Sequence, residues 1–276
     1  MNSKMAGMNI FRELYLCIAV LMVALCTGCI SLIGPDPSFS VTIDEAKADL
    51  REIREVPLPL ERPLVISGGY LDPGTATDRV IRRFEKLTTT PDLVIGTPYF
   101  SVGTMETARR RLVEKVEARF PSDDPEWTTQ VDLVGISMGG LVARYAQMDN
   151  GGAHKRLRIN RLFTLSTPHR GAAVAWLPSI DKKQIAMRRG SAFIELMEET
   201  AADIEYEMLT YVRLGDGIVG THNASPLGMP VRWIPNEAFG FSHLGVQNDP
   251  RLTLEIIRRL RGEEPPSGGE PSPLPQ

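Results

Sequence analysis

The sequence predicts an α/β fold in which a mostly parallel central sheet carries helices on both faces. Apolar stretches of strand length alternate with longer helix-compatible stretches along most of the chain, a pattern typical of consecutive βα units. One strand runs directly into a Gly-x-Ser-x-Gly turn and a helix around Ser137. Residues 172–203 interrupt the alternation, which predicts a small cap insert over the edge of the sheet.

The expected elements follow from the spacing of apolar residues and from the turn residues between them. The expected strands are residues 64–67, 93–97, the segment from Val131 to the turn at Ser137, a segment from Leu162, 208–214 and 231–234. The expected helices are residues 43–54, 77–87, 105–120, the segment after Ser137, and 251–261.

A nucleophile elbow is indicated around Ser137. Gly-Ile-Ser-Met-Gly at residues 135–139 follows an apolar strand and precedes a helix-compatible stretch, the context in which this motif presents a catalytic serine. Glycine at both flanking positions removes the Cβ atoms that would clash where strand and helix converge. The competing interpretation is a glycine-rich turn that only ends a buried strand.

Downstream residues supply partners for the serine in the order serine, acid, histidine. Asp216 lies between two glycines after a predicted strand, and His243 lies in the loop after the last predicted strand. A serine hydroxyl needs a base to take its proton, and a neutral imidazole does this near pH 7. A carboxylate on the other ring nitrogen fixes the tautomer and stabilises the imidazolium. The expected catalytic residues are therefore Ser137, Asp216 and His243.

The remaining histidines are ranked by their positions. His222 follows Asp216 by six residues and is the second choice for the base. His169 is expected to line or brace the site, and His154 to be solvated in a polar loop. Two further acids are the fallbacks for the carboxylate: Glu237 and Asp249. Asp216 has the alternative role of a turn aspartate that bonds its own backbone.

Acyl transfer also requires hydrogen-bond donors for the developing oxyanion. The backbone N–H of Met138, directly after the serine, is the expected first donor. The second is expected from the glycine-containing loop at residues 67–74, with Tyr70 as first choice and Gly69 as second. Both stay open because the sequence does not fix the register of this loop, and an ordinary turn before a helix is the alternative.

With these residues in place, the chain resembles the lipase-like members of the α/β-hydrolase superfamily. The matching segments are residues 135–145, 166–171 and 215–219, together with His243. The Thr-Pro-His-x-Gly run within residues 166–171 is typical of bacterial triacylglycerol lipases and their relatives. The resemblance spans about residues 63–261. It implies the α/β-hydrolase fold and cleavage of carboxylic esters through an acyl-enzyme; we expect no cofactor and no metal.

Two positions depart from the pattern of these lipases. Ile136 stands where many have a histidine, and Ser-Gly-Gly at residues 67–69 stands where many have His-Gly, which bears on the outer oxyanion donor.

The expected partner is an ester or lipid substrate with an apolar acyl chain. Thioesterase, amidase or acyltransferase chemistry on the same scaffold, and a non-catalytic lipoprotein scaffold, are the alternatives. The sequence does not predict the oligomeric state.

Residues 1–28 are interpreted as a lipoprotein-type signal peptide. Basic residues precede the apolar run at residues 14–25, which is too short for a comfortable membrane span. The following Leu-Cys-Thr-Gly-Cys resembles a bacterial lipobox and predicts cleavage before Cys29 and lipid attachment to it, although Cys26 is an unusual occupant of its position. The expected location is the cell envelope, anchored to a membrane and facing an extracytoplasmic compartment. An uncleaved signal anchor is the alternative.

Charge and composition complete the expected organisation. The net charge is −3, with 31 basic and 34 acidic residues, which argues against a nucleic-acid partner. All 3 cysteines lie in the leader, so the catalytic domain has no thiol.

A tether with a short helix at 29–62 precedes the catalytic domain at 63–261, and a disordered tail follows at 262–276. Within the domain, residues 172–203 are a small lid, or alternatively a helix packed on the sheet edge.

Overall fold

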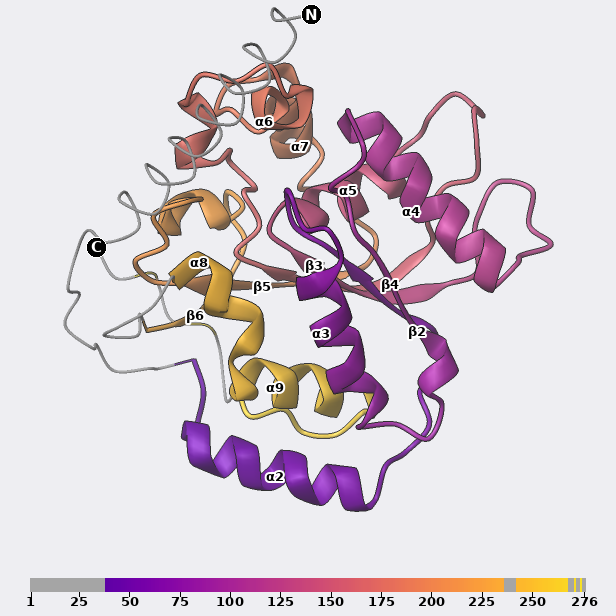
Figure 1. Cartoon of the computed structure of the whole chain (residues 1–276), viewed down its shortest axis with the longest axis vertical. Coiled ribbons are helices and arrows are strands. Elements are labelled where there is room, and N and C mark those ends of the chain that lie inside the picture. Colours follow the sequence, from indigo (N-terminus) through magenta and orange to yellow (C-terminus); the bar gives the residue numbers. More distant parts are fainter. Residues whose placement is uncertain (1–37, 236–241, 268–270, 272–273, 275–276) are drawn as a thin grey trace, which may run out of the picture.

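A computed structural model describes residues 38–235, 242–267, 271 and 274 of the chain (Figure 1). Its centre is a six-stranded sheet in the order β2-β1-β3-β4-β5-β6, in which every neighbouring pair is parallel. The strands are β1 (Leu64–Ser67), β2 (Val94–Thr97), β3 (Val131–Ile136), β4 (Ile159–Leu165), β5 (Glu207–Arg213) and β6 (Val231–Ile234). The predicted parallel sheet is confirmed.

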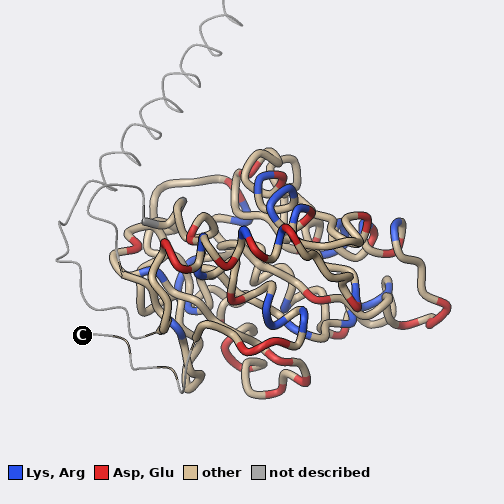
Figure 2. Tube along the Cα trace, turned by 90° about the horizontal axis from the view of Figure 1, so that it is seen from below, with Lys and Arg blue, Asp and Glu red and all other residues tan. Residues whose placement is uncertain are grey.

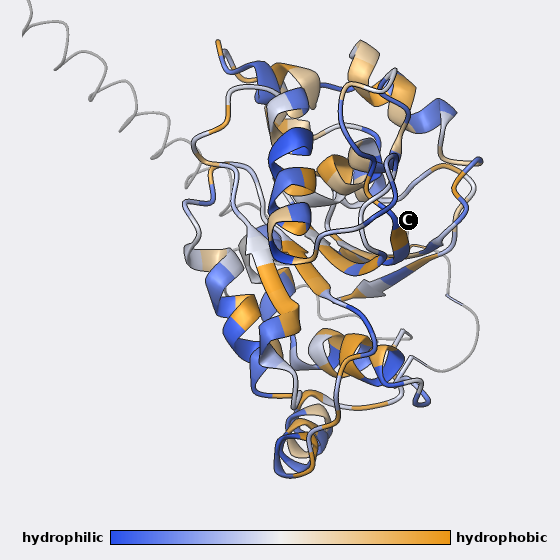
Figure 3. Ribbon diagram, turned by 90° about the vertical axis from the view of Figure 1, so that its right-hand side faces the viewer, coloured by the Kyte–Doolittle hydropathy of each residue, from blue (hydrophilic) through white to orange (hydrophobic). Residues whose placement is uncertain are grey.

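The central strands are apolar because helices cover both faces of the sheet. All residues of β1 and β3 are buried, as expected for a parallel sheet that meets no solvent. In Figure 3 the strands run in orange through the middle of the molecule, while the helices around them carry hydrophilic outer sides. The hydrophobic core consequently consists of two clusters, one on each face.

The helices divide between the two faces of the sheet. They are α2 (Ile43–Glu55), α3 (Thr75–Glu85), α4 (Met105–Arg119), α5 (Met138–Gln147), α6 (Lys182–Ala186), α7 (Ala192–Glu199), α8 (Ser242–Gly245) and α9 (Pro250–Leu260). Four short 3-10 helices complete the described part: η1 (Pro91–Leu93), η2 (Ala173–Trp176), η3 (Thr221–Ala224) and η4 (Val246–Asn248). Helices α4 and α5 cover one face, and α3 and α9 cover the other. Helix α2 packs on α9 as an outer layer (Figure 1).

The strand order places a crevice between β1 and β3. From β1 the chain moves outward to β2 and then returns to the other side of β1 to form β3. In open α/β sheets, such a reversal leaves a crevice at the carboxyl ends of the two strands, where ligands bind. Ser67 at the end of β1 is in register with Gly135 of β3, so the loops that follow the two strands are neighbours.

The predicted insert at residues 172–203 contains η2, α6 and α7. Residues of η2 and α6 line a cavity at the carboxyl edge of the sheet, whereas α7 packs against α5. Ile194 and Met197 of α7 are fully buried there. The insert therefore has a part over the crevice and a part packed on the body.

The beginning of the tail makes specific contacts. The backbone N–H and the hydroxyl of Ser267 donate to the Glu255 carboxylate, at 3.0 and 2.6 Å, and Ser40 N–H donates to the Pro266 carbonyl at 2.9 Å. Glu255 is completely buried in α9, so its carboxylate requires donors. Residues 262–267, which the sequence analysis assigned to a disordered tail, thus supply a buried acid with two of its hydrogen bonds.

Candidate active site

Ser137 lies at the sharp junction between β3 and α5. Its backbone has φ 51° and ψ −123°, a conformation that a non-glycine residue adopts only under strain. A Cβ atom on Gly135 would come within 2.5 Å of the Gly140 Cα, and one on Gly139 within 2.1 Å of the Ser67 carbonyl oxygen. Both glycines are therefore required by close backbone approach, which is the physical basis of the motif.

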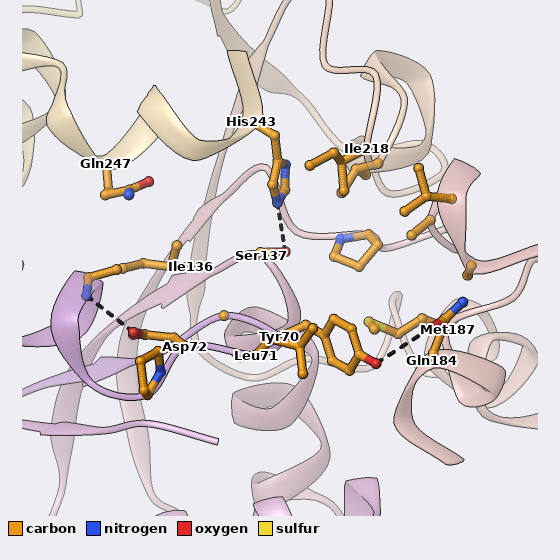
Figure 4. Close-up of a pocket in the computed structure, with 18 of the residues that line it drawn as sticks. Tyr70, Leu71, Asp72, Ile136, Ser137, Gln184, Met187, Ile218, His243 and Gln247 are labelled. Carbon is orange, nitrogen blue, oxygen red and sulfur yellow. Dashed lines mark hydrogen bonds between the residues drawn. The ribbon is translucent and has the colours of Figure 1, made fainter. Parts of the chain in front are cut away.

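The structure brings Ser137, His243 and Asp216 into one hydrogen-bonded chain. The Ser137 Oγ lies 3.0 Å from the His243 Nε2, and the His243 Nδ1 lies 2.7 Å from the Asp216 Oδ2. The three residues follow β3, β6 and β5, so their loops meet at the carboxyl edge of the sheet. In Figure 4 the His243 ring points down from its helix directly at Ser137.

Asp216 is held as an ionised acceptor. Its second oxygen, Oδ1, accepts from the backbone N–H groups of Ile218 and Val219 at 3.0 and 2.9 Å. Burial alone would raise the pKa of Asp216, but His243 and these two N–H groups outweigh it and lower the pKa. Because the carboxylate can only accept, the His243 Nδ1 carries the proton and its Nε2 is free to accept the Ser137 proton.

The alternative histidines lie elsewhere. His169 is buried between the Arg144 guanidinium, which lies 3.1 Å from its Nδ1, and the Thr164 hydroxyl, 3.2 Å from its Nε2. Burial first, and then the charge of Arg144, hold the pKa of His169 well below its ordinary value. His154 lies in the loop after α5 and contacts Glu106 of α4 at 3.2 Å. His222 lies in η3, and among the described residues the histidine that hydrogen-bonds the Ser137 hydroxyl is His243.

The fallback acids also have other positions. Asp249 caps the N-terminus of α9, and its carboxylate is held by the Arg251 side chain at 2.8 and 3.0 Å. Glu237 lies outside the described residues. The only carboxylate within hydrogen-bonding distance of His243, among the described residues, is therefore Asp216.

The expected oxyanion donors surround the serine. Met138 is the first residue of α5, so its backbone N–H has no partner within the helix and the positive end of the helix dipole lies at Ser137. A Cβ on Gly69 would lie 3.6 Å from the Ser137 Cβ, which places the loop after β1 beside the serine. The Tyr70 hydroxyl points away and donates to the Asp181 carboxylate at 3.1 Å. Backbone donors from Gly69 or Tyr70 remain the candidates for the second position.

Asp72 is a buried carboxylate of the loop beside Ser137, and the sequence predicts no role for it. Its carboxylate accepts from the N–H groups of Gly74, Ala76 and Thr77 at 2.9 to 3.1 Å and from the Thr77 hydroxyl at 2.6 Å. Burial would raise the pKa of Asp72, but these donors together lower it. The carboxylate thereby fixes the loop after Gly69 to the start of α3 (Figure 4). The Asp-Pro-Gly turn signal in the sequence was the available clue.

An apolar cavity opens beside the serine. Its volume is about 390 Å³, and both Ser137 and His243 line it. Most of its wall is hydrocarbon, from the end of β3, the loops after β1 and β5, and the insert: Leu71, Ile136, Val174, Met187, Ile218 and Val219. Figure 4 shows Leu71, Ile136, Met187 and Ile218 around the Ser137 hydroxyl, an environment that suits an apolar group of a ligand.

Buried cations attach the insert to the body of the domain. Lys183 of α6 is almost completely buried and donates to the carbonyls of Tyr99 and Val102, at 3.1 and 2.5 Å. Arg144 of α5 donates to the carbonyl of Met197 in α7. These charge-assisted bonds hold the insert in place over the cavity.

Comparisons with known proteins agree with the architecture. A model of the PGAP1-like alpha/beta domain matches residues 104–225. Lipase B from Aspergillus fumigatus superposes with a TM-score of 0.53 at 16% identity, covering 74% of this chain and 54% of that protein. Lipase BlEst2 from Bacillus licheniformis in its mature form gives 0.50 at 15% identity, covering 74% and 93%. The chain has the α/β-hydrolase fold.

A less similar structure and two further findings complete the comparison. Phospholipase PlaB from Legionella pneumophila has a TM-score of 0.44 at 14% identity; the match covers 55% of this chain and 37% of that protein. No curated protein sequence matches the chain. In the part of the chain that the structure describes, no helix is long and apolar enough to cross a membrane, and no cluster of His, Cys, Asp and Glu could hold a metal ion.

Proposed function

We propose that this protein is a serine hydrolase that cleaves carboxylic esters with apolar acyl chains through an acyl-enzyme. The observation that carries the proposal is the Ser137–His243–Asp216 chain, with contacts of 3.0 and 2.7 Å, beside an apolar cavity of about 390 Å³. The similarity to lipases in fold supports an ester or lipid as the substrate.

The reaction follows from the protonation states. His243 Nε2 takes the proton of Ser137 as the Oγ attacks the ester carbonyl, and Asp216 stabilises the imidazolium that forms. The negative oxygen of the tetrahedral intermediate meets the Met138 N–H and a backbone N–H of Gly69 or Tyr70. His243 then gives its proton to the leaving alcohol. A water molecule repeats the sequence on the acyl-enzyme and releases the acid.

Two reagents test the proposal. A fluorophosphonate probe should label the protein at Ser137, and labelling that persists in Ser137→Ala would refute the assignment of the nucleophile. Nitrophenyl esters of increasing chain length should give a kcat/KM that rises with the acyl chain until the cavity is filled, because apolar surface is removed from water. Thioesters and amides with the same acyl chains separate esterase from thioesterase or amidase chemistry.

We further propose that Cys29 carries a lipid that anchors the protein to a membrane of the cell envelope. This segment lies outside the described residues, and the support is the basic start, the short apolar run and Gly28-Cys29 in the sequence. The diacylglyceryl-type modification supplies two or more chains, enough for stable anchoring. Cys29→Ser should abolish lipid labelling and signal cleavage in cells; normal cleavage of this variant would indicate an ordinary secretory signal.

A further inference from the structure

A second hollow, which ester hydrolysis does not use, lies between α2, α3 and the start of α9. Its volume is about 260 Å³. Helix α2 contributes Lys47, Leu50, Arg51 and Arg54 to its wall, and α3 contributes Arg83; the remaining wall is Asn248, Pro250 and Thr253. Four of these side chains are cationic and none is a carboxylate, so we call it the basic groove.

The charge of the basic groove contrasts with that of the whole chain, which is −3. Figure 2 looks onto the side where α2 lies and shows basic and acidic residues mixed over the trace. Lys47, Arg51 and Arg54 follow one another at helical spacing on one face of α2, an arrangement in which like charges repel. Lys47 pairs with Asp44 at 3.0 Å, but within the described part of the chain Arg51 and Arg54 have no ion-pair partner.

Arg83 faces these residues from α3 and is fixed by neutral acceptors. Its guanidinium donates to the Gln247 carbonyl, to the Thr253 hydroxyl at 3.3 Å and to the Asn248 side chain at 3.2 Å. Burial first, and then the charges of neighbouring Arg79 and Arg54, lower the pKa of Arg83. Its positive charge is thus oriented by hydrogen bonds and left without a carboxylate partner among the described residues.

Asp249 is the acid that acts on Arg83, and its effect is small. Its charge raises the pKa of Arg83, but less than burial and the neighbouring arginines lower it. However, the Asp249 carboxylate is already held by Arg251 through two bonds of 3.0 and 2.8 Å. A hollow lined by cations from two helices focuses positive potential on an anion that enters it.

We propose that the basic groove binds the phosphoryl group of a phosphate ester. A phosphate monoester carries close to two negative charges and several acceptor oxygens, which suits guanidinium groups from α2 and α3 that line one hollow. Arginine forks bind phosphate with two parallel hydrogen bonds, so the three arginines supply geometry as well as charge. The headgroup of an anionic phospholipid presents the same phosphoryl oxygens as a phosphate diester, which carries one negative charge.

The test compares two double variants that remove the same charge. Arg51→Gln/Arg54→Gln removes two of the three cations that α2 contributes to the groove. Arg110→Gln/Lys115→Gln removes two exposed cations from α4 on the opposite face of the sheet. Arg83 is left intact because it contacts Gln247, which lines the catalytic cavity. The purified full chain in uncharged detergent is titrated calorimetrically with glycerol 3-phosphate and, separately, with phosphatidylglycerol in the same micelles. Phosphatidylcholine is the neutral blank.

The expected result is saturable binding that added salt weakens, with a Kd at least about tenfold higher in the groove variant and unchanged in the α4 variant. Glycerol 3-phosphate binding indicates a soluble phosphate ester as ligand, and binding of phosphatidylglycerol alone indicates a lipid headgroup. Equal Kd values in the two variants, or no binding of either ligand at millimolar concentration, would overturn the proposal. All the chains compared carry Ser137→Ala, so the ester bonds of phosphatidylglycerol are not cleaved during the titration and the outcome does not depend on the proposed esterase activity.

Discussion

Two buried histidines at the carboxyl edge of the sheet have opposite surroundings. His243 has a carboxylate on Nδ1 and a serine hydroxyl on Nε2. His169 has the Arg144 guanidinium on Nδ1 and the Thr164 hydroxyl on Nε2. Burial and the Arg144 cation keep the His169 ring neutral, whereas the Asp216 carboxylate orients the His243 ring toward Ser137. The partner on Nδ1, and not the residue type or its place in the sheet, therefore distinguishes the two histidines.

The difference extends to what each histidine connects. His243 joins three loops that meet only at the crevice, after β3, β5 and β6. His169 and Arg144 instead join the loop after β4, the elbow helix α5 and, through the Met197 carbonyl, the insert. We interpret the first group as the reacting one and the second as a brace, and variants in each should fail in different ways.

The largest expected effect is on catalysis by the His243 group. Ser137→Ala and His243→Ala should each lower ester kcat/KM by about 10⁴-fold or more, and the double variant should be no worse, because the residues act as a unit. Both should leave the melting temperature nearly unchanged. An active His243→Ala enzyme together with an inactive His222→Ala enzyme would show that the base was assigned wrongly.

Asp216→Asn should have the next largest effect. The amide would favour the wrong His243 tautomer, because it can donate to Nδ1 and leave the proton on Nε2, facing Ser137. We expect a loss of about 10³- to 10⁴-fold in kcat with little change in KM. Steady-state kinetics on a nitrophenyl ester measures this split. A loss confined to KM would mean that Asp216 shapes the cavity and does not orient the histidine.

Much of this arrangement could be predicted from the sequence. The alternation of strands and helices in the sequence predicts the parallel sheet, and the structure confirms it. The prediction works because helices cover both faces of such a sheet, so its central strands must be apolar, as β3 is. The residues assigned to the triad converge in the structure as their order after β3, β5 and β6 suggests. Position relative to parallel strands is visible in a sequence because the carboxyl ends of those strands share one edge.

The brace and the oxyanion loop could not be derived in the same way. The sequence predicts that His169 lines or braces the site, but it does not identify the partner of His169. That partner is Arg144, which also bonds Met197, 53 residues further along the chain, and these contacts form only when the chain is folded. The loop register depends on the Asp72 carboxylate, whose bonds to the start of α3 are specific to the folded chain. Backbone N–H groups have no sequence signature, so the sequence ranks Tyr70 before Gly69 as the second donor but does not decide between them.

Breaking the brace should affect stability more than chemistry. Arg144→Met would remove the donor to the Met197 carbonyl and to His169, leaving buried acceptors without partners. We expect the free energy of unfolding to fall by about 2–4 kcal/mol, measured by urea denaturation. The folded fraction should keep a kcat/KM within about tenfold of wild type. A fall as large as that of His243→Ala, with unchanged stability, would place Arg144 in the chemistry.

The smallest expected effect is a pH dependence of stability that belongs to His169 alone. Its pKa is lowered in the folded protein, so between that pKa and about 6.5 the unfolded chain binds a proton that the native state does not. Stability should therefore rise with pH through about 6.5 and be lost as pH falls, by about 1.4 kcal/mol between pH 8 and 5.5. His169→Gln removes this titration. The difference in unfolding free energy between wild type and His169→Gln should narrow by that amount at pH 5.5, in urea titrations of both proteins at each pH. A difference that stays constant from pH 8 to 5.5 would mean that His169 takes up a proton in the folded state, and the contrast with His243 would fail.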